Sequence, residues 1–319
     1  MSELAGNRTK VAIVGAGAVG ATLAYACLIR GVAREVALYD LDVARVDAEV
    51  LDLRHGLQFV PRADVVGSDD VAVCAGADVV LVTAGAKQKP GQTRLDLAGT
   101  NVEILRSLVP RLLDVAPDAI FVLVTNPVDV LTYATIKISG LPSARVLGTG
   151  TVLDSSRLRD LLARRLGVAV QSVHAWVAGE HGDSEVALWS SATVGAVPLD
   201  RFALPGGSPL SEDEKTTIAS EVVTAAELII RGKGATNYAI GLAGTRVVEA
   251  LLRGEGRVLP VTSLLEGPAG LDDVCLSLPA VIGHGGVEAV LDVPLSAGER
   301  EALHASADKV RGVARSLGL

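Results

Sequence analysis

Short apolar runs and longer helical patterns alternate along the first half of the chain. The runs lie at 10–15, 35–40, 78–83, 119–124 and 145–148 and are rich in β-branched residues. Helical periodicity separates most of them, which is typical of parallel strands covered by helices on both faces. We therefore expect an α/β fold with a doubly wound parallel sheet over residues 1–149.

After about residue 150 the pattern changes to long helical stretches with shorter apolar segments between them. The helical stretches lie near 151–166, 211–231, 234–253 and 296–316. This pattern predicts a second, α+β domain over residues 150–319. No flexible linker separates the halves, so we expect a shared wall, with ligands bound there at the carboxyl ends of the parallel strands.

The turn after the first apolar run carries the pattern Gly15-x-Gly17-x-x-Gly20, and Asp40 closes the next run 20 residues beyond Gly20. A strand, a glycine turn, a helix and a strand-end acid together form the dinucleotide-binding fingerprint of a Rossmann domain. Gly15 permits the tight turn, Gly17 lets a pyrophosphate approach the backbone, and Gly20 lets the helix pack on the strand. The alternative is an ordinary turn between a strand and a helix.

The carboxylate of Asp40 favours NAD over NADP as the cofactor. It would accept hydrogen bonds from ribose hydroxyls and repel the extra phosphate of NADP. Leu41, where a compensating arginine could sit, carries no charge. The alternative for Asp40 is a cap at the end of a strand.

Composition limits the classes of protein that the chain can belong to. Hydrophobic residues make up 49% and aromatic residues 3% of 319 residues, so Ala, Val, Leu and Ile must build the core. A net charge of −8 without a basic block argues against a nucleic-acid partner. The polar start MSELAGNRTK and the lack of an apolar run of ~20 residues argue against a secretory signal and a membrane span, so we expect a cytosolic protein.

Cys27, Cys74 and Cys275 are widely spaced and odd in number. The sequence contains neither C-x-x-C nor H-E-x-x-H, so it predicts no disulfide framework and no metal site. We interpret the three cysteines as small core residues.

Three polar segments offer candidate chemistry. The loop AGAKQKPGQTR contains Gln88 and Arg94, although such a loop is also typical of a solvated surface. In the helix opened by Thr151, Asp154 and Arg157 are three apart and share a face, either for a site or as a surface ion pair. His181 follows a mostly apolar run in the segment GEHGD, as a catalytic or a surface histidine.

Read in order, the motifs resemble those of the 2-hydroxyacid dehydrogenases of the lactate and malate family. They are GAGAVG, AGAKQKPGQTRLDL, VTNPVDV, GTGTVLDSSRLR, GEHGDSE and GKGATNYAIG. Within the family the chain resembles the bacterial L-lactate dehydrogenases. This resemblance implies an NAD-dependent enzyme that interconverts pyruvate and L-lactate by hydride transfer.

The resemblance also implies a role for each matching residue. His181 would be the proton acceptor, Asp154 its orienting carboxylate, Arg157 the clamp on the substrate carboxylate, and Arg94 the cation that polarises the reacting carbonyl. Gln88, Asn126 and Thr236 would complete the substrate pocket. The cofactor would contact Gly15, Gly17, Val19, Gly20, Asp40, Thr83, Gly85, Asn126 and Thr149.

Elementary chemistry agrees with these roles. An imidazole with a pKa near ~6.5 can accept a proton in one direction and donate it in the other. A buried Asp154 would fix the tautomer and stabilise the imidazolium, and the planar guanidinium of Arg157 matches a carboxylate. In the malate dehydrogenases of the family, the loop position that matches Gln88 is an arginine, which pairs with a second substrate carboxylate. A neutral amide there would leave a second substrate carboxylate unpaired, which favours pyruvate.

A second pair of residues suggests an effector site. Arg159 lies ~200° round the helix from Arg157, and His174 lies at an odd offset from His181, so both point away from the candidate catalytic groups. They match the positions that bind fructose 1,6-bisphosphate across a two-fold interface in allosteric bacterial L-lactate dehydrogenases. The resemblance therefore implies a homotetramer activated by this bisphosphate; the alternative is a pair of solvent-facing cations.

Three other functions remain open at this point. A malate or other 2-hydroxyacid dehydrogenase would differ in its substrate pocket. A non-catalytic NAD-binding redox sensor would need the glycine turn and Asp40 but neither His181 nor Arg157. An NAD-dependent glycoside hydrolase would need a metal site, for which the sequence offers no pattern.

Overall fold

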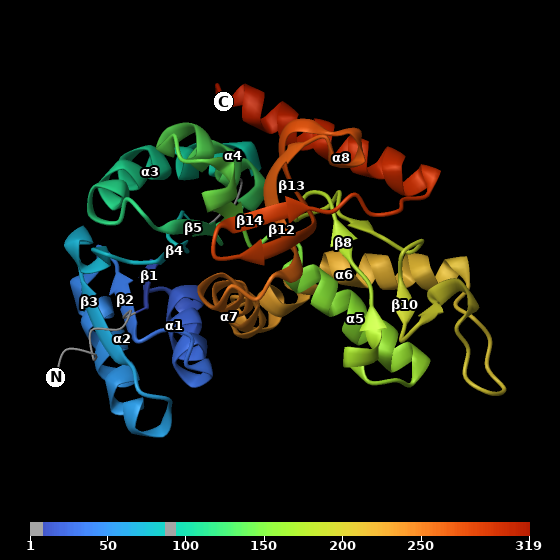
Figure 1. Ribbon diagram of the computed structural model, residues 1–319, viewed down its shortest axis with the longest axis horizontal. Coiled ribbons are helices and arrows are strands. Elements are labelled where there is room, and N and C mark those ends of the chain that lie inside the picture. The colour runs from blue at the N-terminus through green and yellow to red at the C-terminus, as the bar shows by residue number, and fades with distance from the viewer. Residues whose placement is uncertain (1–8, 87–93) are drawn as a thin grey trace.

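A computed structural model describes residues 9–86 and 94–319, with the side chains of the second range starting at residue 95 (Figure 1). The strands are β1 (Lys10–Val14), β2 (Glu35–Tyr39), β3 (Asp64–Ser68), β4 (Val79–Val82), β5 (Ile120–Leu123), β6 (Val146–Gly148), β7 (Val173–His174), β8 (Val177–Ala178), β9 (Val186–Ala187), β10 (Thr193–Val194), β11 (Val197–Pro198), β12 (Arg257–Glu266), β13 (Asp272–Gly283) and β14 (Gly286–Val290). The helices are α1 (Ala18–Arg30), α2 (Val43–His55), α3 (Arg94–Val115), α4 (Val128–Ser139), α5 (Val152–Leu166), α6 (Glu212–Lys233), α7 (Tyr238–Arg253) and α8 (Ala297–Ser316).

One large sheet runs through both halves of the chain. Its strand order is β14-β13-β12-β6-β5-β4-β1-β2-β3. Strands β1 to β6 are parallel in the order of a doubly wound sheet, which confirms the expected α/β fold. The antiparallel strands β12 to β14 continue this sheet through the pairing of Thr262 with Gly148, so its hydrogen bonding crosses the expected boundary between residues 149 and 150. The division into two domains stays a prediction.

Strand β3 was not predicted from the sequence: the apolar runs indicated five parallel strands, and the described residues form six. Its sequence is DVVGS, so only two consecutive valines mark it as a strand. A Cβ at Gly67 would lie 2.5 Å from Cγ2 of Val50, so the packing of α2 favours glycine within the strand. Glycine and polar residues are tolerated because β3 is the edge of the sheet, and they hide it from a search for apolar runs.

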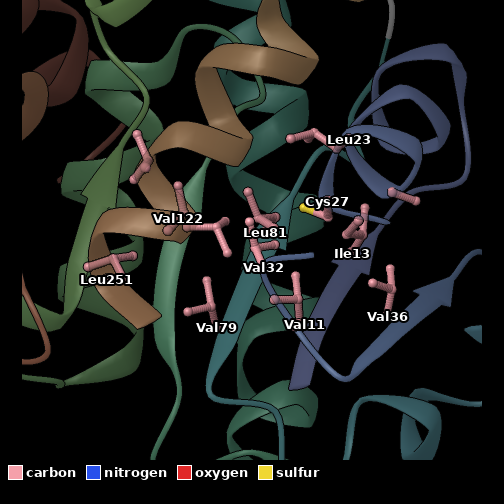
Figure 2. Packing of buried hydrophobic residues seen from close by; sticks show 14 of the residues in the cluster. Val11, Ile13, Leu23, Cys27, Val32, Val36, Val79, Leu81, Val122 and Leu251 are labelled. Carbon is pink, nitrogen blue, oxygen red and sulfur yellow. The ribbon is translucent and has the colours of Figure 1, made fainter. Parts of the chain in front are cut away.

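Alternating residues of each strand pack against helices on opposite faces. Val11 and Ile13 of β1 contact the apolar cluster that includes Leu23 of α1 and Leu251 of α7, as Figure 2 shows. The intervening residues of β1 pack into a second cluster under α3 and α4 on the other face. This two-sided burial follows from the period of two along a strand and explains why the runs read as continuously apolar.

Helix α7 of the second half packs directly on α1, the helix that follows the glycine turn (Figure 1). A Cβ at Gly241 would lie 2.6 Å from Cγ2 of Thr22, and one at Gly244 would lie 2.6 Å from Cδ2 of Leu23. Only small residues allow this approach of the two helices. The contact places the segment before α7, with Thr236, beside the first half of the chain.

The three cysteines are buried and unpaired, which confirms their interpretation as core residues. Burial raises the pKa of the Cys27 thiol to about 12, so the thiol stays protonated and unreactive at neutral pH. Among the described residues, no helix is both long enough and apolar enough to cross a membrane.

Candidate active site

Two close approaches of the backbone shape the glycine turn between β1 and α1. Gly15 has a φ of +105°, and a Cβ there would lie 2.8 Å from the main-chain nitrogen of Ala84. A Cβ at Gly20 would lie 1.8 Å from the carbonyl oxygen of Gly15. Both positions therefore require glycine for the turn and the helix to pack.

Gly17 is not explained by packing within the chain. A Cβ there would meet no protein atom within 4 Å. The residue is the N-cap of α1, and the first turn of a helix leaves main-chain N–H groups without partners inside the helix. The space that a side chain would fill therefore fits a phosphate group, which binds readily at such a helix start.

Asp40, just beyond β2, holds the glycine turn in place. Its Oδ2 accepts a hydrogen bond from the main-chain nitrogen of Ala16 at 2.7 Å, and its Oδ1 accepts one from Asp42 at 3.0 Å. A carboxylate oxygen can accept more than one hydrogen bond, so a ribose hydroxyl can still bind. Both the ribose contact and the alternative role as a cap at the end of the strand stay predictions.

A cavity of about 1370 Å³ extends from Asp40 to His181 along the carboxyl ends of the parallel strands. Its lining includes the predicted residues Gly15, Gly17, Val19, Gly20, Asp40, Thr83, Gly85, Asn126, Thr149, Arg157, His181 and Thr236. The structure thus brings together residues that lie up to 221 positions apart, from Gly15 to Thr236. The glycine turn and Asp40 at one end fit a dinucleotide, and the charged residues at the other end fit a small acid.

Two predicted residues cannot be placed in this cavity. Gln88 and the side chain of Arg94 lie outside the described residues. Their roles stay predictions. The cavity also contains Arg45, which the sequence analysis missed and which forms an ion pair with Asp42 at 3.6 Å. The uncharged Leu41 is therefore followed, one turn further along the chain, by a cation that also lines the cavity.

Hydrogen bonds from distant segments fix the middle of the cavity. The buried Asn101 of α3 donates from Nδ2 to the carbonyl oxygen of Asn126 at 2.9 Å. Its Oδ1 accepts a hydrogen bond from the main-chain nitrogen of Ala86 at 2.7 Å. The hydroxyl of Thr83 donates to carbonyl oxygens of the glycine turn, both at 3.0 Å. Asn126 is thereby held in register with the end of β4.

At the catalytic end, one buried carboxylate joins an imidazole to a guanidinium. Oδ2 of Asp154 lies 2.6 Å from Nδ1 of His181, and its Oδ1 accepts a hydrogen bond from Nη1 of Arg157 at 2.6 Å. Asp154 is only 1% exposed and lies behind the cavity wall, whereas the other two residues line the cavity. Nδ1 of the imidazole is therefore engaged, which leaves Nε2 for a ligand. Arg157 keeps further N–H donors for a carboxylate.

The pKa values follow from this arrangement. Burial alone would lower the pKa of His181, but the charge and hydrogen bond of Asp154 outweigh it and raise the pKa to about 9. Burial acts to raise the pKa of Asp154, yet His181 and Arg157 together hold it below its usual range. The pair is therefore an imidazolium and a carboxylate at neutral pH, ready to donate a proton to a ligand.

The donor atoms of Asp154, His181 and Glu185 lie within 4.8 Å of one another, a grouping that a metal ion could use. Two observations argue against this use. The separation of 2.6 Å between Asp154 and His181 is typical of a charge-assisted hydrogen bond, and the guanidinium of Arg157 already occupies the other oxygen of Asp154. The grouping fits proton transfer better than metal binding.

Two buried acids beside His181, Glu185 and Asp129, were not predicted from the sequence. Burial and the charge of Asp154 raise the pKa of Glu185 to about 8, and its Oε1 has no hydrogen-bond partner among the described residues. Asp129 is 1% exposed, and its Oδ2 accepts a hydrogen bond from the main-chain nitrogen of His181 at 2.8 Å. Both lie within motifs already noted, GEHGDSE and VTNPVDV, but an acid near a turn or a helix start is usually solvated.

Arg159 and His174 do not line the cavity. Nε of Arg159 donates to the carbonyl oxygen of Ala175 at 2.8 Å, and its guanidinium stacks 4.2 Å from the centre of the Trp176 ring. Burial and the charge of Arg257 lower the pKa of Arg159, so a further cation faces this region. His174 is exposed on β7.

Two family models match almost the whole chain. Residues 9–148 match the NAD binding domain of lactate/malate dehydrogenases, and residues 151–314 match the α/β C-terminal domain of the same enzymes.

Individual relatives cover nearly the same extent. The L-lactate dehydrogenase of Bifidobacterium animalis subsp. lactis is 53% identical over 311 residues, which are 97% of both chains. The L-lactate dehydrogenase of a Synechococcus species is 50% identical over 308 residues, 97% of this chain and 99% of that protein. The crystal structure of the minor L-lactate dehydrogenase from Enterococcus mundtii, in a ligand-bound form, superposes with a TM-score of 0.93 at 41% identity and covers 97% of this chain and 98% of that one.

Proposed function

The chain belongs to the lactate/malate dehydrogenase family, and from this premise we propose that it is an NAD-dependent L-lactate dehydrogenase that interconverts pyruvate and L-lactate. The observation that carries the proposal is the link from Arg157 through Asp154 to His181 on the wall of the cavity that begins at the glycine turn. This link offers a carboxylate clamp and a proton donor side by side. A small 2-oxo acid needs both.

The residues of the chain have distinct tasks in this reaction. When bound, NADH supplies the hydride that reduces the carbonyl carbon of pyruvate. His181 donates a proton from Nε2 to the carbonyl oxygen, and in lactate oxidation it takes the proton back. Asp154 keeps the proton of Nδ1 directed toward itself and stabilises the imidazolium. Arg157 binds the substrate carboxylate through its remaining N–H groups and so fixes the carbonyl beside His181.

The choice between pyruvate and oxaloacetate rests on Gln88. A second substrate carboxylate beside a neutral amide would lose its hydration without gaining a partner, which disfavours oxaloacetate. The names of the two relatives described above support the same choice. A malate dehydrogenase is the nearest alternative.

NADH oxidation with pyruvate and with oxaloacetate, measured side by side, tests the proposal. We expect a higher kcat/KM for pyruvate, and a higher value for oxaloacetate would overturn it. In Gln88→Arg the preference should move toward oxaloacetate, because a charge-assisted pair contributes ~1.5 to 3 kcal/mol. An unchanged ratio of the two kcat/KM values in this variant would remove the specificity role of Gln88.

A non-catalytic NAD-binding redox sensor is the alternative from another class. Binding NAD alone does not require the buried carboxylate of Asp154 between an imidazole and a guanidinium. Such a carboxylate is costly to bury unless it is paired. The same assay separates the two functions, because a sensor would bind NADH without oxidising it in the presence of pyruvate.

NAD rather than NADP is the cofactor, because the first half of the chain is the family's NAD binding domain and Asp40 lies at the end of β2. Arg45 shares that end of the cavity, but its ion pair with Asp42 already neutralises part of its charge. We expect a preference for NADH of about 2 kcal/mol or more. Equal kcat/KM values for NADH and NADPH would contradict this expectation.

We further propose activation by fructose 1,6-bisphosphate at Arg159 and His174. The hydrogen bond from Arg159 to Ala175 places the guanidinium beside the strand of His174, and the exposed Arg257 adds positive charge to the region. Arg159 and Arg157 lie on the same helix, α5, so an effector that orders the helix would also order the substrate clamp. Coupling of ~1 to 3 kcal/mol would lower the half-saturating pyruvate concentration.

A pyruvate titration with and without millimolar bisphosphate tests this regulation. The double variant Arg159→Gln, His174→Gln should lose the activation and keep the basal activity. Equal activation of the variant, or unchanged curves for the unmodified protein, would remove the effector site while leaving the catalytic roles untouched.

A homotetramer is the assembly that we propose. Tyr25 and Ile29 of α1 and Tyr238 and Leu242 of α7 are 57%, 49%, 72% and 57% exposed, although the two helices pack together. Large exposed apolar side chains on neighbouring helices favour a protein interface. Light scattering of the purified protein checks the assembly. The cytosolic location expected from the sequence stays a prediction.

A further inference from the structure

The buried carboxylate of Asp129 stands out because no lysine or arginine of the described residues pairs with it. It lies in the first turn of α4 and is 1% exposed. Its Oδ2 accepts a hydrogen bond from the main-chain nitrogen of His181 at 2.8 Å, and its Oδ1 accepts one from the hydroxyl of Thr262 at 2.6 Å. Among the described residues no lysine or arginine forms an ion pair with it. Burying a carboxylate charge without a lysine or arginine partner costs free energy, so the charge of Asp129 needs an explanation.

We propose that Asp129 is a positioning residue for His181, which fixes the main chain of the histidine and stabilises its imidazolium form with a second negative charge. The proposal rests on the proton-transfer role of His181 given above. It adds a carboxylate from α4 to the one that α5 contributes through Asp154.

An uncharged side chain would satisfy the same two hydrogen bonds. Asparagine in this place could accept from the main-chain N–H of His181 and donate to the hydroxyl of Thr262. The hydrogen bonds therefore explain the shape and position of the side chain but not its charge. A charge facing an imidazolium explains it, because the attraction offsets part of the burial cost.

The pKa values support this electrostatic role. Burial raises the pKa of Asp129 to about 6, so the group is still ionised at neutral pH. Its charge is one of the influences that raise the pKa of His181 against the lowering effect of burial, after the charge and hydrogen bond of Asp154. Arg157 and Glu185 are the other charged or titratable groups on the side of the imidazole.

Other groups facing Asp129 do not replace this role. The carboxylate of Glu180 lies nearby, but it forms an ion pair with Lys309 of α8 at 2.6 Å. The thiol of Cys275 on β13 is buried, and burial raises its pKa well above the usual value, so it stays neutral. Within the part of the chain that the structure describes, Asp129 is therefore the carboxylate on the main-chain side of His181 that no lysine or arginine pairs with.

A contact between α8 and the segment that carries His181 offers a matched control without a charge. The hydroxyl of Ser306 on α8 accepts a hydrogen bond from the main-chain nitrogen of Glu180 at 2.8 Å and contacts the hydroxyl of Ser184 at 3.1 Å. Ser306→Ala would loosen the segment that carries His181 but leave every charge in place. Asp129→Asn would do the reverse, since it removes a charge and keeps the hydrogen-bonding shape.

The experiment compares pH profiles of kcat/KM for both directions in Asp129→Asn, Ser306→Ala and the unmodified protein. In Asp129→Asn we expect the fall of pyruvate reduction and the rise of lactate oxidation to move to lower pH by about one unit, because imidazolium loses a stabilising charge. Ser306→Ala should lower kcat several-fold without moving either profile. Profiles of Asp129→Asn that coincide with those of the unmodified protein would overturn the proposal.

A second readout does not depend on the enzyme's activity. The chain has five histidines, so ring signals in NMR spectra can be assigned to His181 by their loss in His181→Asn. The ring should titrate about one unit lower in Asp129→Asn than in the unmodified protein. An unchanged ring pKa would refute the role of Asp129, whereas an inactive unmodified protein would refute only the proposed reaction.

Asp129→Ser keeps the test decisive if Asp129→Asn does not fold. The smaller side chain also removes the charge, so the ring pKa of His181 should fall as it does in Asp129→Asn. An unchanged ring pKa in this variant would also contradict the proposal.

Discussion

At the nucleotide end of the cavity, the glycine turn and Asp40 come from one continuous stretch, residues 10–40, and the turn contributes mainly its main chain. At the catalytic end, the site is built from charged side chains of α4, α5 and the segment before β9, with Thr262 of β12 behind them. The first end needs glycines that keep side chains away. The second needs charges that are buried close to one another.

This difference determines how each end responds to change. Main-chain N–H groups do not titrate and have no side chain to substitute, so the nucleotide end is sensitive to added volume. The catalytic end depends on the proton of His181, which the charge of Asp154 holds in place, so it is sensitive to charge and pH. Substitutions at the two ends should therefore separate cofactor binding from chemistry.

The largest effect should come from His181→Asn. Loss of the proton donor is expected to lower kcat for pyruvate reduction by about 10² to 10⁴-fold. The affinity for NADH, followed by its fluorescence, should change little, because the glycine turn is untouched. His55→Asn, at the exposed end of α2, is the matched control and should keep full activity. Retention of more than a few per cent of activity in His181→Asn would contradict the role of His181 as the proton donor.

The next largest effect should come from Arg157→Lys. The charge remains, but an ammonium cannot bind Asp154 and a substrate carboxylate in the planar, forked manner of a guanidinium. A loss of about 1.5 to 3 kcal/mol in kcat/KM for pyruvate is expected. Arg164→Lys, an exposed arginine on the same helix, serves as the control. Equal kinetics of Arg157→Lys and the unmodified protein would exclude a bidentate clamp.

Gly17 and Gly20 of the turn should behave differently from each other. In Gly20→Ala the new Cβ would meet the carbonyl oxygen of Gly15 at 1.8 Å, so the protein should lose about 1 to 3 kcal/mol of stability. In Gly17→Ala no protein atom is within 4 Å of the Cβ, so the Tm should stay the same while the Kd of NADH rises about tenfold. Thermal unfolding and NADH titration of both variants check this. A destabilised Gly17→Ala with unchanged NADH affinity would contradict the phosphate site.

The smallest effect is a difference in pH dependence between the two ends. The pKa of His181 is raised to about 9, so pyruvate reduction should stay constant through neutral pH and fall as pH passes that value. Lactate oxidation needs the neutral imidazole and should rise over the same range. NADH affinity, which depends on the glycine turn, should not follow this curve. Profiles for the two directions that bend at unrelated pH values would argue against one shared group.

The sequence alone predicted the parallel sheet, because its strands are buried on both faces and are therefore continuously apolar, unlike segments exposed to solvent. It also predicted the glycine turn with Asp40, since all its parts lie within one stretch of chain. Strand β3 was not predicted, because an edge strand tolerates Gly67 and polar residues and so lacks a continuous apolar run. The roles of His181, Asp154 and Arg157 came from resemblance rather than from spacing, which by itself allowed surface residues as well.

Only the tertiary structure showed how the catalytic end is assembled. The bond between Asp154 and His181 spans 27 positions, and the contact between Asp129 and His181 spans 52, so no local pattern predicts them. Only folding determines whether an acid near a helix start is solvated or buried, and thus whether its pKa is shifted. Local main-chain geometry is set by nearby residues and can be read along the chain, whereas the energy of a charge depends on everything packed around it.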